Sequence, residues 1–390
     1  MDFHPQPRLP RGFSCAARNI GLKESAPDLA LFYSAVDAET AALFTRNHVV
    51  GAPVAVGREM LAGGGTLRAI VANSKISNVG MGDEGIADAR RMGAAAAREL
   101  GVPTEHVLMS STGVIGRRLP IERIEAGLAG MKADLQDDPV VGARGIMTTD
   151  THPKALSCAV GDAVLTIVAK GSGMVEPNLA TVLIYIFTDA KLPGGLLDRL
   201  LRDAVDVSFN MLSVDSDTST SDTCVLMANG LAGPVVPDAF GAALTAAGIR
   251  MAEIMARDGE GATKLLRARI TGAAGRDDAR RIAKSIINSP LVKTMAYGAD
   301  PNLGRVLMAI GKCFDCRVDP TRLLVRLNGV PVYDRGRRVD VSNEAELRAL
   351  LAGDPVDVEA DLGLGDGAAT AFGCDLTPGY IDENAAYYSS

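Results

Sequence analysis

Residues 170–190 read Lys-Gly-Ser-Gly-Met-Val-Glu-Pro-Asn-Leu-Ala-Thr-Val-Leu-Ile-Tyr-Ile-Phe-Thr-Asp-Ala. The second half of this stretch, Val182 to Phe187, is an unbroken apolar run rich in β-branched and aromatic residues, which predicts a strand buried on both faces. The first half is interrupted by Gly and Pro and predicts a loop. Thr181 stands where the loop meets the strand, so its hydroxyl is expected at the rim of a sheet, where a reaction can use it.

Thr181 has two interpretations. If the peptide bond before it were cut, its new α-amino group, with an ordinary pKa of about 7.7, could act as the base for its own hydroxyl. The residue would then be a nucleophile that needs no other base. The alternative is structural, because Thr favours strands and many apolar runs begin with it.

The segment from Lys170 to Thr181 resembles the self-cleavage segment of the ornithine acetyltransferase family, which is also called glutamate N-acetyltransferase. Further matches follow in order along almost the whole chain, so the resemblance is far more specific than any one motif. They are Ser-Thr-Gly-Val-Ile-Gly (111–116), Met-Thr-Thr-Asp-Thr (147–151), Asp-Thr-Ser-Thr-Ser-Asp-Thr (217–223), Asp-Gly-Glu-Gly-Ala-Thr-Lys (258–264) and Asn-Ser-Pro-Leu-Val-Lys-Thr (288–294).

The resemblance implies a self-processing enzyme whose precursor cuts itself between Ala180 and Thr181. An α chain of residues 1–180 and a β chain of residues 181–390 are then expected to fold together and to assemble as an α2β2 heterotetramer. The implied fold class is α+β, an α-β-β-α layered sandwich of the ornithine acetyltransferase and self-processing aminopeptidase type. The resemblance does not decide whether the chain also has a smaller C-terminal α/β subdomain.

The resemblance also implies the active-site residues. Thr181 is the expected nucleophile, and Thr112 and Gly113 are the expected oxyanion donors. A Gly after a strand lets a backbone N–H approach a ligand closely, although an ordinary strand-ending turn has the same sequence. The expected substrate-binding residues are Thr148, Lys170, Thr181, Glu260, Asn384 and Ser389.

The implied reaction is the transfer of an acetyl group from N-acetylornithine to glutamate through acetyl-Thr181, a step of arginine biosynthesis. The α-amino group of Thr181 would act first as base and then as acid. Neither a metal nor an organic cofactor is expected, and acetyl-CoA is an alternative acetyl donor within the family. The competing class is a self-processing aminopeptidase or amidohydrolase, in which water takes the acyl group, because sequence does not show how well a site excludes water.

The composition describes a globular protein that acts on small molecules. The chain has 390 residues, of which 47% are hydrophobic and 22% charged, and its net charge is -7, which argues against a nucleic-acid-binding surface. The first residues lack the apolar region of a signal peptide, and no run is expected to be long enough to span a bilayer. We therefore expect a cytoplasmic protein with no membrane partner.

Other motifs suggest cofactor or metal sites, but the residues around them argue against each such site. The run 363–367, Gly-Leu-Gly-Asp-Gly, does not open a helical pattern, which argues against a dinucleotide site. The run 215–219, Asp-Ser-Asp-Thr-Ser, is not followed by the Gly and the closing Glu of a calcium loop, so a structural role near the site is expected. Cys313 and Cys316 form a lone Cys-x-x-Cys in a chain with only 4 His, so a pair of free thiols is expected.

The rest of the chain mixes helical and strand patterns. Apolar periodicity predicts helices over 86–100 and 237–257, and a strand over 29–33 followed by a short helix at 41–44. A hairpin is expected to turn at Asn328-Gly329. The segment 136–139, Gln-Asp-Asp-Pro, is the only one that resembles a linker.

Three departures from the family pattern concern specificity. Lys75-Ile-Ser-Asn78 stands where the family usually has a Gly-Asn-rich turn, and Leu303 and Phe372 stand where it commonly has Trp. These changes are either neutral replacements or signs of a paralogue that serves a specialised pathway.

Overall fold

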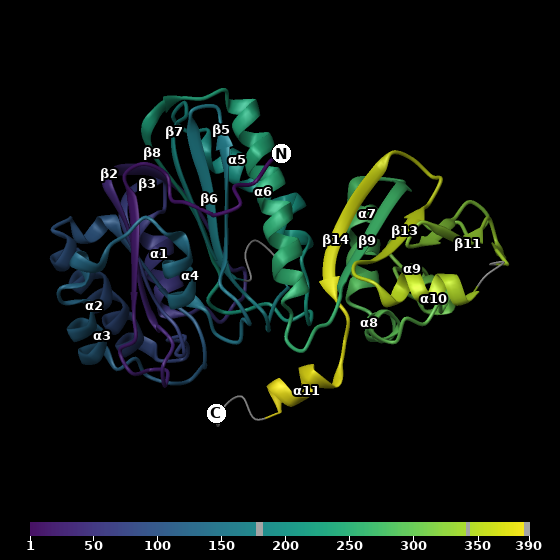
Figure 1. The fold of residues 1–390 in the computed structure, drawn as a ribbon, viewed down its shortest axis with the longest axis horizontal. Helices are drawn as coiled ribbons and strands as arrows, with labels where there is room; N and C mark the ends of the chain where they lie inside the picture. Colours follow the sequence, from purple (N-terminus) through teal and green to yellow (C-terminus); the bar gives the residue numbers. More distant parts are fainter. Residues whose placement is uncertain (177–181, 341–343, 386–390) are drawn as a thin grey trace. The chain divides into compact units, whose positions relative to one another are not determined.

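The computed structural model describes residues 1–176, 182–340 and 344–385, which form two compact units (Figure 1). Unit 1 comprises the described parts of Met1–Gly171, Pro177–Asn210 and Thr218–Met251. Unit 2 comprises the described parts of Ser172–Glu176, Met211–Asp217 and Ala252–Ser390. The boundary between the units therefore differs from the expected cleavage boundary. Strands β7 and β8, which follow residue 181, pair with β6 and β2, which precede it.

Unit 1 is built on one extended, folded sheet with the strand order β4-β3-β2-β8-β7-β6-β5, and β1 pairs with β2 in addition. The strands are β1 (Phe13–Arg18), β2 (Leu29–Phe44), β3 (Gly65–Asn73), β4 (Val107–Ser111), β5 (Lys154–Val160), β6 (Ala163–Lys170), β7 (Leu183–Lys191) and β8 (Thr223–Pro234). The helices are α1 (Ala52–Met60), α2 (Gly82–Leu100), α3 (Ile121–Leu128), α4 (Pro139–Ile146), α5 (Leu197–Val207) and α6 (Pro237–Arg257), with short 3-10 helices at Thr104–His106, Met131–Asp134 and Phe209–Met211.

The sheet folds into two layers at the long strand β2. Its pairing with β3 is interrupted between Tyr33 and Ala38, and its second half pairs with β8. The layers meet face to face, since the Phe32 ring of β2 lies 5.2 Å from the Tyr185 ring and 5.4 Å from the Phe187 ring of β7. These rings belong to one buried cluster with side chains of β1, β3, β4, β6 and β8.

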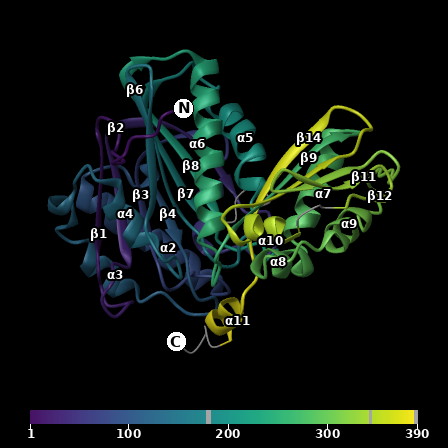
Figure 2. The ribbon, with the colours of Figure 1, turned by 45° about the vertical axis from the view of Figure 1, so that its right-hand side comes forward.

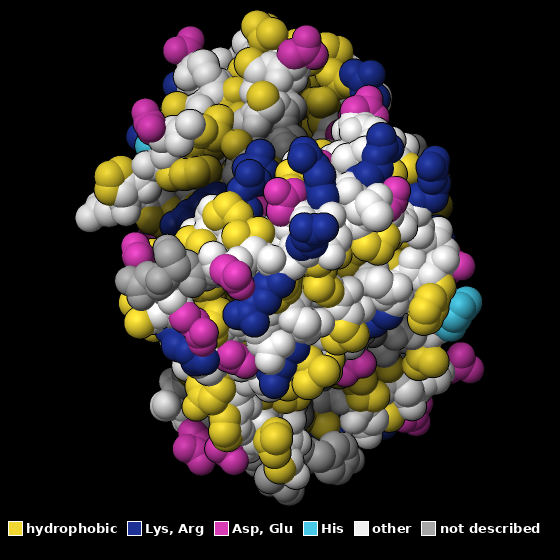
Figure 3. Space-filling model, turned by 90° about the vertical axis from the view of Figure 1, so that its right-hand side faces the viewer, with side chains coloured by type: hydrophobic (Ala, Val, Ile, Leu, Met, Phe, Trp, Pro, Cys, Tyr) yellow, Lys and Arg dark blue, Asp and Glu magenta, His cyan; other side chains and the backbone are white. Residues whose placement is uncertain are grey.

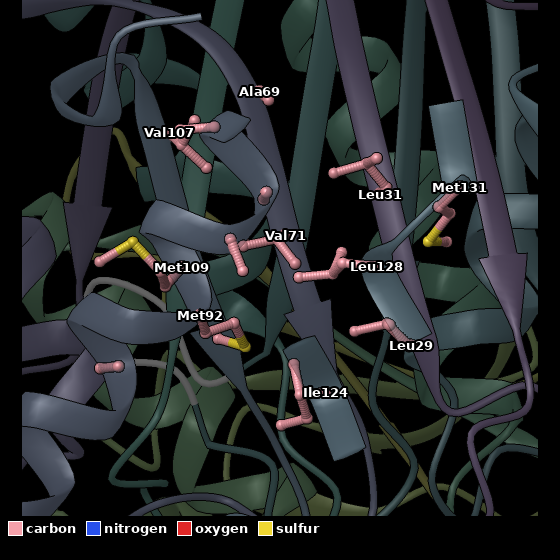
Figure 4. Packing of buried hydrophobic residues seen from close by; sticks show 14 of the residues in the cluster. Leu29, Leu31, Ala69, Val71, Met92, Val107, Met109, Ile124, Leu128 and Met131 are labelled. Carbon is pink, nitrogen blue, oxygen red and sulfur yellow. The ribbon is translucent and has the colours of Figure 1, made fainter. Parts of the chain in front are cut away.

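Helices cover the outer face of each layer. Leu29, Leu31, Val71 and Met109 alternate with residues that face the inner core, and they pack on α2 and α3 (Figure 4). On the other layer α5 and the unit 1 part of α6 lie beside β5–β8 (Figures 1 and 2). The order of layers is therefore helix, sheet, sheet, helix, the predicted α-β-β-α sandwich.

Strand β7 confirms the prediction made from the run Val182–Phe187. Tyr185 and Phe187 point into the core between the layers, while Ile184 and Ile186 are buried on the opposite face. Because both faces are covered, the sequence of the strand is apolar without alternation.

The α6 prediction over 237–257 is also confirmed, but the expectation about membrane length is not. Among the described residues α6 alone is long and apolar enough to cross a bilayer by length and composition. Half of its most apolar window is buried inside the protein, which is typical of the core helix of a soluble protein.

Unit 2 contains a six-stranded sheet with the order β12-β11-β10-β13-β9-β14. The strands are β9 (Leu265–Ala273), β10 (Leu324–Leu327), β11 (Val330–Asp334), β12 (Arg337–Arg338), β13 (Val356–Asp361) and β14 (Gly367–Cys374). The helices are α7 (Arg276–Ile287), α8 (Pro290–Tyr297), α9 (Leu303–Gly311), α10 (Glu344–Ala352) and α11 (Pro378–Asn384). The hairpin β10-β11 turns at Asn328-Gly329 as predicted, with positive φ at both residues.

Two local predictions were wrong. Residues 41–44 belong to β2, where Ala41 pairs with Leu226 and Leu43 with Cys224, because the hydrogen bonds to β8 outweigh the weak helix preference of this Ala-rich run. Residues 136–139 are not a linker, since they lie inside unit 1 and the Asp138 side chain accepts a hydrogen bond from the Val140 N–H at the start of α4.

The surface carries both signs of charge. On the face shown in Figure 3, Lys and Arg side chains are interspersed with Asp and Glu side chains and with hydrophobic ones. The net charge of -7 is thus the small difference between 47 acidic and 40 basic residues.

Candidate active site

Thr112 and Gly113 form a turn at the carboxyl end of β4. The Thr112 N–H donates to the Asn73 carbonyl at 3.0 Å and the Val114 N–H donates to the Lys75 carbonyl at 2.9 Å, which holds the turn against the end of β3. Gly113 has a φ of +125°, and a Cβ atom there would lie 2.2 Å from the Lys75 carbonyl carbon. Only glycine fits this position.

The turn can supply two hydrogen-bond donors to a ligand. No described residue accepts a hydrogen bond from the Gly113 N–H, whereas the amides on both sides of it are used. The buried Thr112 hydroxyl accepts a hydrogen bond from Lys170 Nζ at 3.1 Å, so its own proton can be donated elsewhere. This arrangement suits the oxyanion role predicted for Thr112 and Gly113.

Asp150 joins two of the expected substrate-binding residues, Thr148 and Lys170. Its carboxylate accepts hydrogen bonds from the Thr148 N–H at 2.9 Å, from the Gly171 N–H at 2.8 Å and from Lys154 Nζ at 2.5 Å. Burial acts to raise the pKa of Asp150, but the ammonium groups of Lys154 and Lys170 outweigh it, and the pKa falls to about 2. Asp150 is therefore an ionised, buried anchor that fixes the backbone beside both residues.

Sequence reasoning did not single out Asp150 or Lys23 as site residues. The signal for Asp150 was present, because it lies in the segment 147–151 that matches the family and a Lys follows it at i+4. Lys23 carries no such signal. Its ammonium donates to the carbonyls of Pro27 at 2.9 Å and Met147 at 2.7 Å, and such partners cannot be read from sequence. Burial lowers the pKa of Lys23 to about 8.

In unit 2 the expected residues Glu260 and Asn384 are in contact. The Asn384 side-chain amide donates to Glu260 Oε2 at 2.7 Å. The Glu260 carboxylate also lies on the backbone of Gly173, where a Cβ atom would come within 2.1 Å of Oε2, and the Glu260 N–H donates to the Ser172 carbonyl at 3.0 Å. Glu260 is only 9% exposed, so its carboxylate is held in a defined place.

The loop 258–264 that carries Glu260 is fixed from both sides. The buried Asp375 carboxylate accepts hydrogen bonds from the N–H groups of Thr263 and Lys264 and from the Thr263 hydroxyl. Thr377 donates its hydroxyl to the Gly261 carbonyl at 2.6 Å and also caps α11. The capping residue therefore joins the loop to the helix that ends at Asn384.

The hydroxyl-rich segment near residue 217 has a structural role, as predicted. Asp215 accepts hydrogen bonds from the N–H groups of Met174 and Val175, and the Asp217 carbonyl accepts one from the Glu176 N–H. These bonds all lie within unit 2 and hold the segment 172–176, which includes Gly173.

Three expected residues lie outside the described part of the chain. They are Ala180 and Thr181 at the expected cleavage point and Ser389 near the carboxyl end. Their roles stay predictions from the sequence.

Among the described residues, no group of three or more His, Cys, Asp or Glu side chains could hold a metal ion. Cys313 and Cys316 are both free thiols, as expected. Burial, with the nearby Asp278, raises the pKa of Cys316 to about 11.

The two positions where the family commonly has Trp differ in their surroundings. Phe372 is buried in β14, which makes it a core residue. Leu303 begins α9 and lines a cavity of about 400 Å³ together with Leu307, Val332 and Leu347. The exchange at Phe372 is thus a packing change, whereas Leu303 borders an open space in unit 2.

Known proteins resemble this chain over nearly its whole length. It is 43% identical over 380 residues to the arginine biosynthesis bifunctional protein ArgJ 2 of Clostridium acetobutylicum, with 97% of this chain and 98% of that protein covered. It is 44% identical over 388 residues to the glutamate N-acetyltransferase Oat2 of Streptomyces clavuligerus, with 98% of each covered.

A solved structure shares the fold. The crystal structure of the arginine biosynthesis bifunctional protein argJ from Bacillus halodurans matches with 38% identity and a TM-score of 0.50, covering 53% of this chain and 98% of that one. The model of the ArgJ family matches residues 14–389. A match of this extent, together with relatives above 40% identity, establishes that the chain belongs to the ArgJ family.

Proposed function

We propose that this protein transfers an acetyl group from N-acetylornithine to glutamate in arginine biosynthesis, giving ornithine and N-acetylglutamate. Membership of the ArgJ family supports the proposal, as do the names of the relatives. The observation that carries it is the 3.1 Å contact between Lys170 Nζ and Thr112 Oγ1 beside the Gly113 N–H. Lys170, predicted to bind substrate, and Thr112, predicted to donate to the oxyanion, are 58 positions apart in the chain and meet in one buried place.

The reaction consists of two displacements. Thr181 Oγ1 attacks the amide carbonyl of N-acetylornithine while its proton passes to its own α-amino group. Thr112 and Gly113 donate hydrogen bonds to the oxyanion. The C–N bond then breaks, and the protonated α-amino group returns the proton to the departing ornithine amine. Acetyl-Thr181 remains, and the amine of glutamate takes the acetyl group by the same steps in reverse order.

The chain of this enzyme is expected to be cut between Ala180 and Thr181. A cut there gives a carboxyl-terminal chain of 210 residues, 181–390, out of 390. The solved Bacillus halodurans chain supports this reading, since it is matched over 98% of its length and yet covers only 53% of the present chain. The role of Thr181 itself rests on the sequence.

The remaining assignments follow from the family. We expect a soluble cytoplasmic protein that assembles as an α2β2 heterotetramer and needs neither a metal nor an organic cofactor. Thr148, Lys170, Glu260, Asn384 and Ser389 would bind the amino-acid substrates. Acetyl-CoA is the alternative donor.

Product analysis tests the proposal. Purified protein is incubated with N-acetylornithine, with and without glutamate, and ornithine and N-acetylglutamate are both measured. Equal formation of the two products supports transfer. Ornithine and acetate formed at the same rate without glutamate would identify a hydrolase instead. A parallel incubation with acetyl-CoA and glutamate decides whether acetyl-CoA is used as a donor.

A further inference from the structure

A short segment of the expected α chain belongs to unit 2. The segment is Ser172–Glu176, and the other described residues of unit 2 come from Met211–Asp217 and Ala252–Ser390. All of these other residues follow the expected cleavage point after Ala180. Once the chain is cut, the segment 172–176 is therefore an α-chain segment whose neighbours within unit 2 all belong to the β chain.

Backbone hydrogen bonds hold the segment 172–176 in place. The Val175 carbonyl accepts a hydrogen bond from the Val214 N–H at 2.7 Å, and the Val175 N–H donates to the Asp215 carboxylate at 2.8 Å. The Glu176 N–H donates to the Asp217 carbonyl at 3.0 Å. Each of these bonds joins a residue before the expected cut to a residue after it.

The Glu176 side chain adds contacts with side chains of the β chain. Its Oε2 atom accepts hydrogen bonds from the Ser213 hydroxyl at 2.8 Å and from the Asn288 side-chain amide at 2.6 Å. Its Oε1 atom lies 3.1 Å from Lys284 Nζ, in an ion pair whose side chains are 18% (Lys284) and 22% (Glu176) exposed. Because hydrogen bonds to an ionised group are stronger than those between neutral groups, this carboxylate is a firm attachment for the segment.

Helix α7 fixes two of the partners of Glu176. Lys284 lies in its last turn and also donates to the Leu212 carbonyl at 2.8 Å, and Asn288 follows its last residue. Burial lowers the pKa of Lys284, and the attraction to Glu176 opposes this shift. Removing the Glu176 carboxylate would leave the Lys284 ammonium mostly buried with less compensation. The ion pair therefore couples the segment to α7.

The segment in turn supports Glu260. The Glu260 carboxylate lies against the backbone of Gly173, and the Glu260 N–H donates to the Ser172 carbonyl. Before the cut, the chain is continuous on both sides of the segment. After the cut, the segment leads only to the free end of the α chain, so its place beside Glu260 depends more strongly on its noncovalent contacts.

We infer that Glu176 holds the end of the α chain on the β chain after self-cleavage and thereby keeps Glu260 in position to bind substrate. The inference rests on the proposed function and its cut between Ala180 and Thr181. Glu176 is a positioning residue, since it acts on the substrate through the segment 172–176 and Glu260. Its contacts with Ser213, Asn288 and Lys284 replace the constraint that the intact peptide bond provided.

Amide hydrogen exchange followed by mass spectrometry tests the attachment of the segment. Glu176→Ala is compared with the wild type in the cut protein and in the uncut Thr181→Ala background. In the cut protein, the amides of 172–176 should exchange at least about tenfold faster in Glu176→Ala, which is the effect of losing one charge-assisted hydrogen bond. In the uncut background the acceleration should be smaller, because the chain still joins the segment to β7.

Steady-state kinetics test the effect on substrate binding. Glu176→Ala should raise KM with a smaller change of kcat, as Glu260→Gln should, because both variants weaken binding in the ground state. Glu176→Gln keeps an oxygen that can accept hydrogen bonds from Ser213 and Asn288, so it should recover part of the loss. Where Glu176→Ala does not reach the cut form, Glu176→Gln decides by the same two measurements.

An exposed glutamate of unit 2 provides the matched control. Glu344 is paired with Arg348 at 3.3 Å, and its side chain is 57% exposed. Glu344→Ala removes the same side chain from a different place, and it should alter neither the exchange of the segment 172–176 nor KM.

The outcomes separate this inference from the proposed function. A cut and active wild type, with unchanged exchange and KM in Glu176→Ala, would overturn the role of Glu176 only. Equal acceleration of exchange in the cut and uncut proteins would overturn it as well, since Glu176 would then stabilise unit 2 regardless of the cut. A loss of kcat without a change of KM would disconnect Glu176 from Glu260. An uncut wild type without transfer would reject the proposed function, and this inference with it.

Discussion

Replacing Asp150 by Asn should destabilise unit 1 strongly, because the side chains of Asp150 and Lys154 are both 0% exposed and lie 2.5 Å apart. Removing one partner of a buried ion pair typically costs about 3–5 kcal/mol, since the other charge stays buried without its counterion. The lowered pKa of Asp150 has the same sign, because the folded protein favours its ionised form even after the cost of burial.

An exposed pair with the same spacing provides the control. Arg202 and Asp198 are also four residues apart and lie 2.7 Å from each other, but their side chains are 50% and 55% exposed. Asp198→Asn should therefore cost only about 0.5 kcal/mol or less. The difference between the two variants isolates the effect of burial.

Urea unfolding followed by far-UV circular dichroism measures both variants. A double-mutant cycle with Lys154→Met should give a coupling energy of about 1.5 kcal/mol or more between Asp150 and Lys154. Losses below about 1 kcal/mol in Asp150→Asn, with a coupling near zero, would refute the view that this pair anchors the site.

The pH dependence follows from the sign of the pKa shift. Because the pKa of Asp150 is lower in the folded protein, its stabilisation is present above pH 3.8 and is lost as the pH falls through 2. The stability difference between the wild type and Asp150→Asn should therefore shrink steadily from pH 4 to pH 2.

Three further predictions concern the reaction. Denaturing electrophoresis should show the wild type as two fragments that meet before Thr181 and Thr181→Ala as one full-length chain; an intact and fully active wild type would contradict the mechanism. Thr112→Ala should lower kcat by about 100-fold or more with a smaller effect on KM, and an effect on KM alone would reassign Thr112 to ground-state binding. Gly173→Ala would place a Cβ atom 2.1 Å from Glu260 Oε2 and should therefore raise KM, as Glu260→Gln should. Gly194→Ala is the control, because open space surrounds Gly194 and its KM should not change. Equal KM values in all three variants would remove Glu260 from substrate binding.

The sequence pattern predicted the strand β7, and the family resemblance implied the layered fold class and most candidate site residues. The apolar run of β7 is explained by burial on both faces, and such burial leaves a signal in consecutive residues. The site residues were predicted from the motifs that match the family in order along the chain, because each motif holds several of these residues within a short segment. Thr112, Gly113, Thr148 and Lys170 were all predicted in this way.

Only the tertiary structure decided which segments that are distant in sequence come into contact. Residues 41–44 became part of β2 because β8, which begins 179 residues after position 44, supplies the hydrogen bonds. Lys23 binds carbonyl groups, and every residue has one, so no residue type marks its partners. Lys170, at the end of β6, reaches the Thr112 hydroxyl just after β4 because the fold brings the ends of these two strands together. Electrostatic energy depends on the distances between charges, and folding alone sets those distances.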